Sequence, residues 1–207
     1  VMKFKLFGVR LCLSYPLAAG IALLLIFDPT GMAACCLAAA VCHELGHILA
    51  MRHYGTGVEK IRMSAFDVNI TDVQQRKRGL KAELVICLAG VFVNFVLFLL
   101  TIAIYSWYNL YIFRYFALSN LSLCIFNALP VESLDGGNAL ELILQRNFSD
   151  KAVYFITLAV SLAIVIPLGL FSFMALLKSP YNFTMLFAVL YLISVIIFKR
   201  KKYITGG

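Results

Sequence analysis

The residues best suited to chemistry in this sequence are His43, Glu44 and His47, which form an HExxH motif. No other histidine or charged residue lies between positions 31 and 51. Residues four apart on a helix lie about one turn apart, so both imidazoles share one face. Two imidazoles can hold a zinc ion, and the adjacent carboxylate is a candidate general base for a water molecule. The motif therefore predicts zinc-dependent hydrolysis.

The motif lies in a chain with the composition of a membrane protein. Of its 207 residues, 62% are hydrophobic and only 14% are charged, and the mean hydropathy is +0.92. A soluble domain carries about 25% charged residues. We predict an all-α polytopic membrane protein, a single domain over residues 1–207 with about six transmembrane helices of near 20 residues each. The predicted spans are 11–27, 32–51, 84–106, 111–130, 152–176 and 182–198.

The net charge of +8 follows the loops between these spans. All but two of the 18 basic residues lie at the two termini or in the loops after the second and fourth spans; the exceptions are Arg114 and Lys178. The positive-inside rule then predicts that both termini are cytoplasmic in a multi-pass cell membrane. This distribution does not indicate a nucleic-acid site.

A zinc site of this kind needs a third protein ligand. His53 lies six residues after His47, but on a continuous helix it points away from His47. Asp135 is the better candidate, since Pro130 breaks any helix before it and Gly136-Gly137 allows close backbone approach. From spacing alone, a zinc ligand and an ordinary Asp-Gly turn remain equal alternatives for Asp135.

An intramembrane HExxH followed by a distant LDGG resembles the site-2 protease family of intramembrane zinc metalloproteases. The resemblance covers residues 30–145, or spans two to four, which correspond to the three-helix core of the family. It implies that His43, His47 and Asp135 bind one Zn²⁺ and that Glu44 is catalytic. The order of spans is most similar to the branch of the sporulation sigma-factor processing peptidase. Members of that branch often end in a CBS domain, which this sequence does not contain.

The family also tends to carry a GPxxN motif on the intervening helix. Gly90 and Asn94 match it, whereas Val91 replaces the proline. Asn94 is a lone amide in an apolar span, so we expect it to face the protein interior. Two roles are open for Asn94: a hydrogen-bond donor to substrate, or a polar contact between helices.

Residues 58–75 alternate in part between apolar and polar side chains, which predicts a short membrane-associated β-hairpin. The resemblance implies that a strand here can pair with an unwound substrate segment. A peripheral loop on the lipid surface is the alternative. Residues 76–78, Arg-Lys-Arg, are expected to contact anionic headgroups.

Taken together, the resemblance implies an intramembrane endopeptidase that cleaves single-span or membrane-associated proteins, such as a tethered transcription or sigma factor. It also implies regulation by an inhibitory membrane partner. A metal-ion transporter is one alternative, because intramembrane His, Glu and Asp also mark ion pathways. Residues 152–198 contain no Asp, Glu or His, so the matched halves of a transporter are not evident. A catalytically inactive membrane scaffold is the other alternative.

Overall fold

The computed structural model describes residues 2–6, 9–13, 15–55, 58–64, 67–72, 79–178 and 184–205. The chain divides into two compact units, Val1–Ile125 and Phe126–Gly207, which are described separately below.

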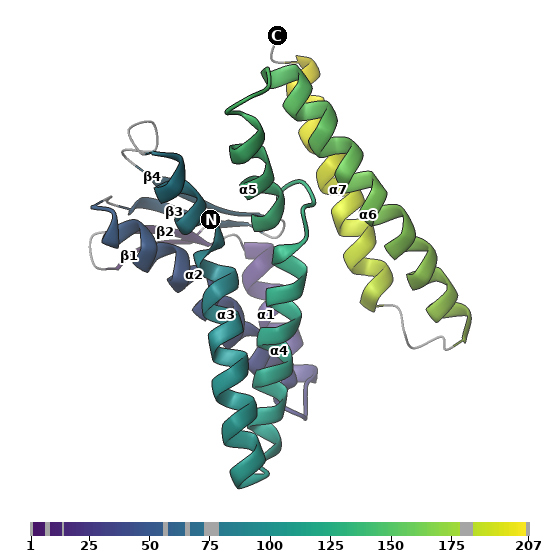
Figure 1. The fold of residues 1–207 in the computed structure, drawn as a ribbon. Coiled ribbons are helices and arrows are strands. Elements are labelled where there is room, and N and C mark those ends of the chain that lie inside the picture. The colour runs from purple at the N-terminus through teal and green to yellow at the C-terminus, as the bar shows by residue number, and fades with distance from the viewer. Residues whose placement is uncertain are drawn as a thin grey trace. The chain divides into compact units, whose positions relative to one another are not determined.

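The first unit is built mainly from four helices (Figure 1). These are α1 (Tyr15–Phe27), α2 (Met32–His53), α3 (Leu80–Tyr108) and α4 (Tyr111–Ala128), whose last three residues belong to the second unit. Gly46 brings α2 close to α3, because a Cβ atom at this position would lie 2.9 Å from the Ala89 carbonyl oxygen. A close approach of this kind suits helices that carry small residues at their contact.

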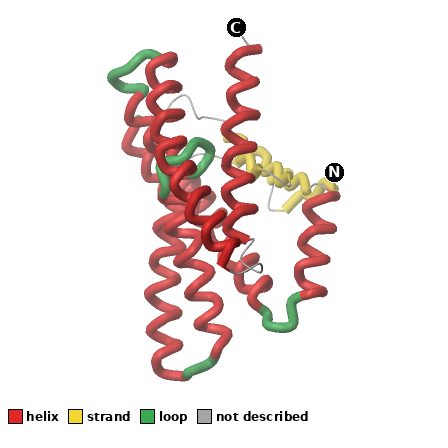
Figure 2. The backbone as a smooth tube through the Cα atoms, turned by 90° about the vertical axis from the view of Figure 1, so that its right-hand side faces the viewer, coloured by secondary structure: helices red, strands yellow, loops and turns green. Residues whose placement is uncertain are grey.

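A four-stranded sheet belongs to the same unit (yellow in Figure 2). Its order is β1 (Met2–Leu6), β2 (Val9–Leu13), β3 (Val58–Ser64) and β4 (Asp67–Asp72). The β1–β2 and β3–β4 pairs are antiparallel, and β2 runs parallel to β3. The hairpin expected within 58–75 corresponds to β3 and β4.

The N-terminal hairpin, β1 and β2, corrects two predictions. The span 11–27 is wrong at its start, because residues 11–13 belong to β2 and the helix begins at Tyr15. The all-α class with one short hairpin is likewise incomplete, because β1 and β2 join β3 and β4 in a four-stranded sheet. The physical cause is visible in residues 3–6 and 10–13, where basic and apolar residues partly alternate with the period of two that favours a strand. The apolar end of β2 runs directly into the apolar start of α1, which hid the boundary.

Among the described residues, three helices are long and apolar enough to cross a membrane: α2, α3 and α6 (Asp150–Lys178). Shorter apolar segments occur at Ala18–Phe27 in α1 and Met185–Ile197 in α7 (Thr184–Thr205). The described residues thus support a membrane protein with three of the six predicted spans at full length, and the other three stay predictions.

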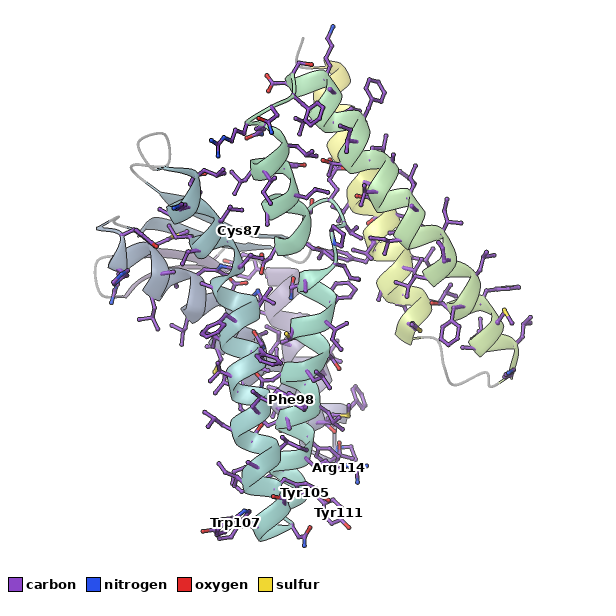
Figure 3. The ribbon with its side chains drawn as sticks, in the orientation of Figure 1. Cys87, Phe98, Tyr105, Trp107, Tyr111 and Arg114 are labelled. Carbon is purple, nitrogen blue, oxygen red and sulfur yellow. The ribbon has the colours of Figure 1, made fainter. Side chains whose placement is uncertain are left out.

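Aromatic side chains gather where α3 ends and α4 begins (Figure 3). Trp107 and Tyr111 are 86% and 66% exposed, and the figure labels Tyr105 and Arg114 at the same end. Tryptophan and tyrosine are enriched where a membrane meets water. This end of the helix pair therefore has the character of an interfacial region.

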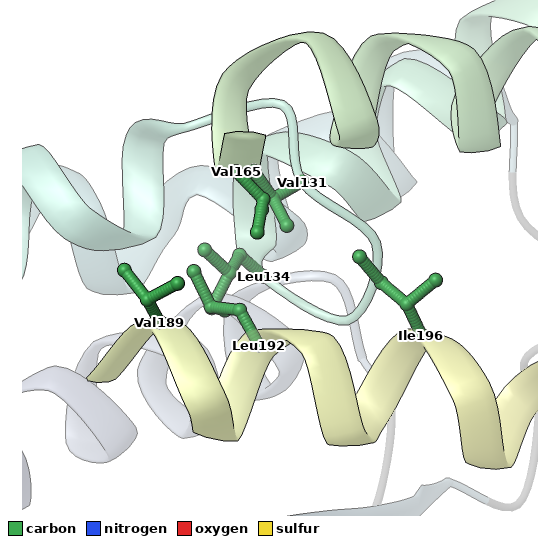
Figure 4. Packing of buried hydrophobic residues seen from close by; sticks show 6 residues of the cluster. All are labelled: Val131, Leu134, Val165, Val189, Leu192 and Ile196. Atoms are coloured by element: carbon green, nitrogen blue, oxygen red, sulfur yellow. The ribbon is translucent and has the colours of Figure 1, made fainter. Parts of the chain in front are cut away.

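The second unit contains α5 (Asp135–Leu144), α6 and α7. Its core is a cluster of buried aliphatic side chains from α6, α7 and the segment before α5 (Figure 4). The cluster consists of Val131, Leu134, Val165, Val189, Leu192 and Ile196. The segment before α5 is also anchored by a hydrogen bond, since the Glu132 backbone N–H donates to Ser161 Oγ at 2.8 Å. These contacts hold the start of α5, and with it Asp135, in place within this unit.

Candidate metal centre

The two histidines of the motif lie one turn apart on the buried face of α2. His43 is 6% exposed and His47 is 8% exposed. Their rings meet edge to face with centroids 4.9 Å apart, and the two Nε2 atoms are 3.2 Å apart. The helix therefore presents two nitrogen atoms to a single point.

Each imidazole is oriented from α3 through its other nitrogen. His43 Nδ1 lies 2.7 Å from Asn94 Oδ1, and His47 Nδ1 lies 2.8 Å from the Ile86 carbonyl oxygen. Both partners are acceptors, so both Nδ1 atoms carry the proton and donate. In that tautomer each Nε2 bears a lone pair. Metal-binding histidines are commonly held by a hydrogen bond of this type.

The orientation of the Asn94 amide follows from its other hydrogen bonds. Its Nδ2 donates to Asn120 Oδ1 at 3.0 Å and to the Ala39 carbonyl oxygen at 3.4 Å. Asn120 Nδ2 in turn donates to the Phe116 carbonyl oxygen at 2.8 Å. Each amide nitrogen therefore faces an acceptor, and Asn94 Oδ1 must face His43. Asn94 is fully buried, and a hydrogen bond from it to substrate stays a prediction.

Gly90 makes room for the imidazoles beneath α3. A Cβ atom at Gly90 would lie 2.5 Å from His47 Nε2 and 2.7 Å from His43 Nε2. Cβ atoms essentially never come this close to other heavy atoms. The glycine of the family motif is therefore required by the contact between α3 and the two ligand atoms.

Asp135 belongs to the second unit, where it is the first residue of α5. Gly136 and Gly137 follow it, and Cβ atoms there would collide with the carbonyl groups of Ala128 and Val131, respectively. The two glycines thus permit the tight chain reversal before α5. As a carboxylate held at the start of a helix, Asp135 stays the predicted third ligand for the two histidines.

The donor set fits zinc. Two nitrogens on a tetrahedral zinc ion at about 2.0–2.1 Å would be about 3.3 Å apart, which matches the 3.2 Å between the Nε2 atoms. Two imidazoles and one carboxylate are also the protein ligands of known catalytic zinc sites.

The remaining candidates lie elsewhere on α2. Glu44 is next to His43 and only partly buried. His53 is exposed at the end of α2, where its ring contacts Tyr54 with centroids 5.3 Å apart, away from the buried face that carries His43 and His47.

Two groups that take part in the hydrogen bonds around the histidines were not predicted from the sequence. Asn120 could have been noticed, since it is a second amide within an apolar stretch, as Asn94 is. The Ile86 carbonyl could not, because a backbone group carries no sequence signal.

Comparisons with known proteins show what the chain is similar to. Residues 107–168 match Peptidase family M50. Over 139 residues the chain is 27% identical to Stage IV sporulation protein FB of Bacillus subtilis, which covers 65% of this chain and 48% of that protein. Over 113 residues it is 31% identical to a zinc metalloprotease of Methanocaldococcus jannaschii, which covers 52% of this chain and 32% of that protein. The chain thus spans less than half the length of either curated relative.

A solved structure shows the same fold. The site-2 protease from Methanocaldococcus jannaschii superposes with a TM-score of 0.69 at 22% identity, covering 92% of this chain and 91% of that chain. The family match and the two curated relatives add sequence similarity to this likeness of fold. The chain is therefore similar in sequence to Peptidase family M50 over residues 107–168, and similar in fold to a site-2 protease.

Proposed function

We propose that this protein is a zinc-dependent endopeptidase that cleaves a peptide bond in or near a transmembrane segment of another protein. His43, His47 and Asp135 hold one Zn²⁺, and Glu44 is the catalytic base. The observation that carries the proposal is the pair of Nδ1 hydrogen bonds from the histidines to Asn94 and Ile86. They turn both Nε2 lone pairs toward one point before any metal binds.

In this proposal the chemistry is divided between the ion and Glu44. Bound zinc lowers the pKa of a water molecule and polarises the carbonyl group of the scissile bond. Glu44 accepts a proton from the attacking water and delivers it to the nitrogen of the leaving group. Its carboxylate suits this exchange, because it is adjacent to a ligand and only partly buried.

Besides its hydrogen bond to His43, Asn94 is proposed to contact the substrate. Its longer hydrogen bond, 3.4 Å to the Ala39 carbonyl, is the one that a substrate carbonyl could replace. The shorter bond to Asn120 and the bond to His43 would remain.

The proposed substrates are single-span or membrane-associated proteins, including tethered transcription or sigma factors. A helical substrate shields its peptide bonds, so the scissile segment must first unwind; glycine and proline in it favour this. Among the described strands, β4 lies at one edge of the sheet. Its outer backbone groups could pair with the unwound segment. We further propose that both termini are cytoplasmic and that a membrane partner inhibits the protease.

Replacement of the base tests the proposal directly. We expect Glu44→Gln to lower the cleavage rate about 10²–10⁴-fold, because proton transfer is lost. Bound zinc should stay at the wild-type amount, since Glu44 is not a proposed ligand. The measurement combines mass spectrometry of new termini in single-span proteins, incubated with purified enzyme, with elemental analysis of zinc.

Glu83→Gln is the matched control, because it removes a carboxylate from the first turn of α3 and should cleave normally. Cleavage by Glu44→Gln at the wild-type rate would exclude this mechanism. A wild-type protein without bound zinc would exclude the metalloprotease.

A further inference from the structure

The amide of Asn120 lies two hydrogen bonds away from a proposed zinc ligand. Asn120 is on α4 and fully buried. Its Oδ1 accepts from Asn94 Nδ2 on α3, and Asn94 Oδ1 accepts from His43 Nδ1 on α2. Three helices of one unit thus contribute to a single chain of polar contacts. We infer that Asn120 is a positioning residue, which fixes the tautomer and orientation of His43 through Asn94; this inference rests on the proposed zinc site.

The direction of the chain is set at its far end. The Phe116 carbonyl oxygen can only accept, so it selects the nitrogen of Asn120 as its partner. Asn120 Oδ1 is thereby directed at Asn94 and selects the nitrogen of Asn94. Asn94 Oδ1 is then the atom that faces His43, and it selects the Nδ1–H form of the imidazole. In that form Nε2 is the metal ligand.

Without Asn120, the present direction of the Asn94 amide is favoured only by its longer contact, 3.4 Å from Nδ2 to the Ala39 carbonyl oxygen. The Asn94 amide could turn its nitrogen toward His43 Nδ1, with its oxygen in the position of the lost acceptor contact. Nδ1 would then have to accept, and the proton would move to Nε2. A protonated Nε2 cannot bind a metal, so zinc would bind only after the imidazole and the amide had both reverted.

If Asn120 had a purely structural role, different effects of its replacement would be expected. A buried side chain that only joins helices would alter the stability of the helix packing, with no preference for one tautomer of His43. The inference is therefore tested by zinc affinity and by the protonation of the imidazole nitrogens, neither of which depends on proteolytic turnover.

The experiment replaces Asn120 in the full chain in detergent micelles. Asn120→Leu removes both polar atoms at similar volume. Asn120→Asp restores them, because a protonated carboxyl group can donate to the Phe116 carbonyl and accept from Asn94. Ser119→Ala is the matched control: Ser119 is buried next to Asn120, donates to Tyr115 O at 2.8 Å, and contacts Cys36 on α2.

Zinc affinity is measured by competition with a chromophoric chelator, and the imidazole tautomers of the zinc-free protein by ¹⁵N NMR of labelled histidine. We expect Asn120→Leu to weaken zinc binding about tenfold, the lower end of the range for outer-shell partners. It should also raise the Nε2–H population of His43. Asn120→Asp and Ser119→Ala should resemble wild type in both measurements.

The inference would be overturned if Asn120→Leu bound zinc with wild-type affinity and kept the wild-type tautomer of His43. An equal loss in Ser119→Ala would also overturn it, since the effect would then come from helix packing. If Asn120→Leu does not fold, Asn120→Ala answers the same question with a smaller side chain. A wild-type protein that binds no zinc would instead refute the proposed function, so the two failures are distinguishable.

Discussion

Gly90 illustrates how a single residue without a side chain can determine a metal site. Its Cα lies against the two imidazoles, and a methyl group at this position would enter the space of both Nε2 atoms. Those atoms cannot move away, because each imidazole is also held at Nδ1 by α3. Substitution at Gly90 must therefore displace the ligands or separate α2 from α3.

We expect Gly90→Ala to weaken zinc binding by tenfold or more, through this displacement of both ligand atoms. The control is Gly20→Ala in α1, where an added Cβ would have no neighbour within 4 Å. Alanine there should leave zinc binding unchanged and stabilise the helix by roughly 0.5–1 kcal/mol. Chelator competition and thermal unfolding measure both effects. Equal zinc affinity in the two variants would contradict the role assigned to Gly90.

At the scale of residues, the sequence carried most of the information about the site. His43, Glu44 and His47 could be named because their chemistry is unusual in an apolar chain, whereas Asp135 was chosen through the family resemblance. The tautomers of the histidines could not be predicted. They depend on the direction of two amide groups and on a backbone carbonyl from α3, which only the folded arrangement defines.

At the scale of elements, α2 begins with a cap supplied from outside the helix. Asp28 Oδ1 accepts from the backbone N–H and the hydroxyl of Thr30 at 2.9 and 2.5 Å, and Asp28 Oδ2 accepts from the Ala33 N–H at 2.5 Å. The Thr30 hydroxyl is the main cause of a lowered pKa of Asp28, followed by the Ala33 N–H. The carboxylate thus stabilises the first turn of the helix that carries His43 and His47.

The lowered pKa gives this cap a defined pH dependence. A carboxyl group with a pKa below its ordinary 3.8 stabilises the fold above that pH, and this contribution is lost as pH falls through the folded-state pKa. We expect Thr30→Val to raise the pKa of Asp28, so that the loss begins at higher pH. Thermal unfolding midpoints between about pH 2 and 5 measure this shift. In the Asp28→Asn background, Thr30→Val should not change the pH at which the thermal midpoint falls. If Thr30→Val still moved that pH in this background, Asp28 would not be the group responsible.

Helix boundaries were predicted less well than helix positions. The spans 32–51, 84–106 and 152–176 correspond to α2, α3 and α6, each of which is longer by two or more residues at one or both ends. The added ends include charged residues such as Arg52 and Glu83, which an apolar pattern does not include. The short helix α5 was not predicted, and β1 and β2 were missed because the apolar sequence continues from β2 into α1.

At the scale of the whole molecule, the histidine part of the proposed zinc site should be formed before a metal binds. The imidazoles are held by Asn94 and Ile86, so the local structure does not require the ion. We expect removal of zinc by a chelator to leave the helical circular dichroism unchanged. The thermal midpoint should fall, because a ligand that binds only the folded state stabilises it, by about 2.7 kcal/mol at a free concentration 100 times its Kd.

Zinc-saturated chelator is the control for this measurement and should change neither signal. Added zinc should restore the midpoint. Loss of the helical signal with the metal would mean that the ion organises the fold, contrary to the hydrogen bonds described for His43 and His47.

The close contact of α2 with α3 at Gly46 has a mechanical consequence. The ligands His43 and His47 are on α2, whereas both groups that orient them are on α3. Sliding one helix along the other by a single residue, about 1.5 Å, would break both orienting bonds together. It would also drive the Gly46 backbone into Ala89 and Val93, which already leave no room for a methyl group. We therefore expect the two helices to move as one body, so that an opening for the proposed substrate would come from displacement of other elements around this pair.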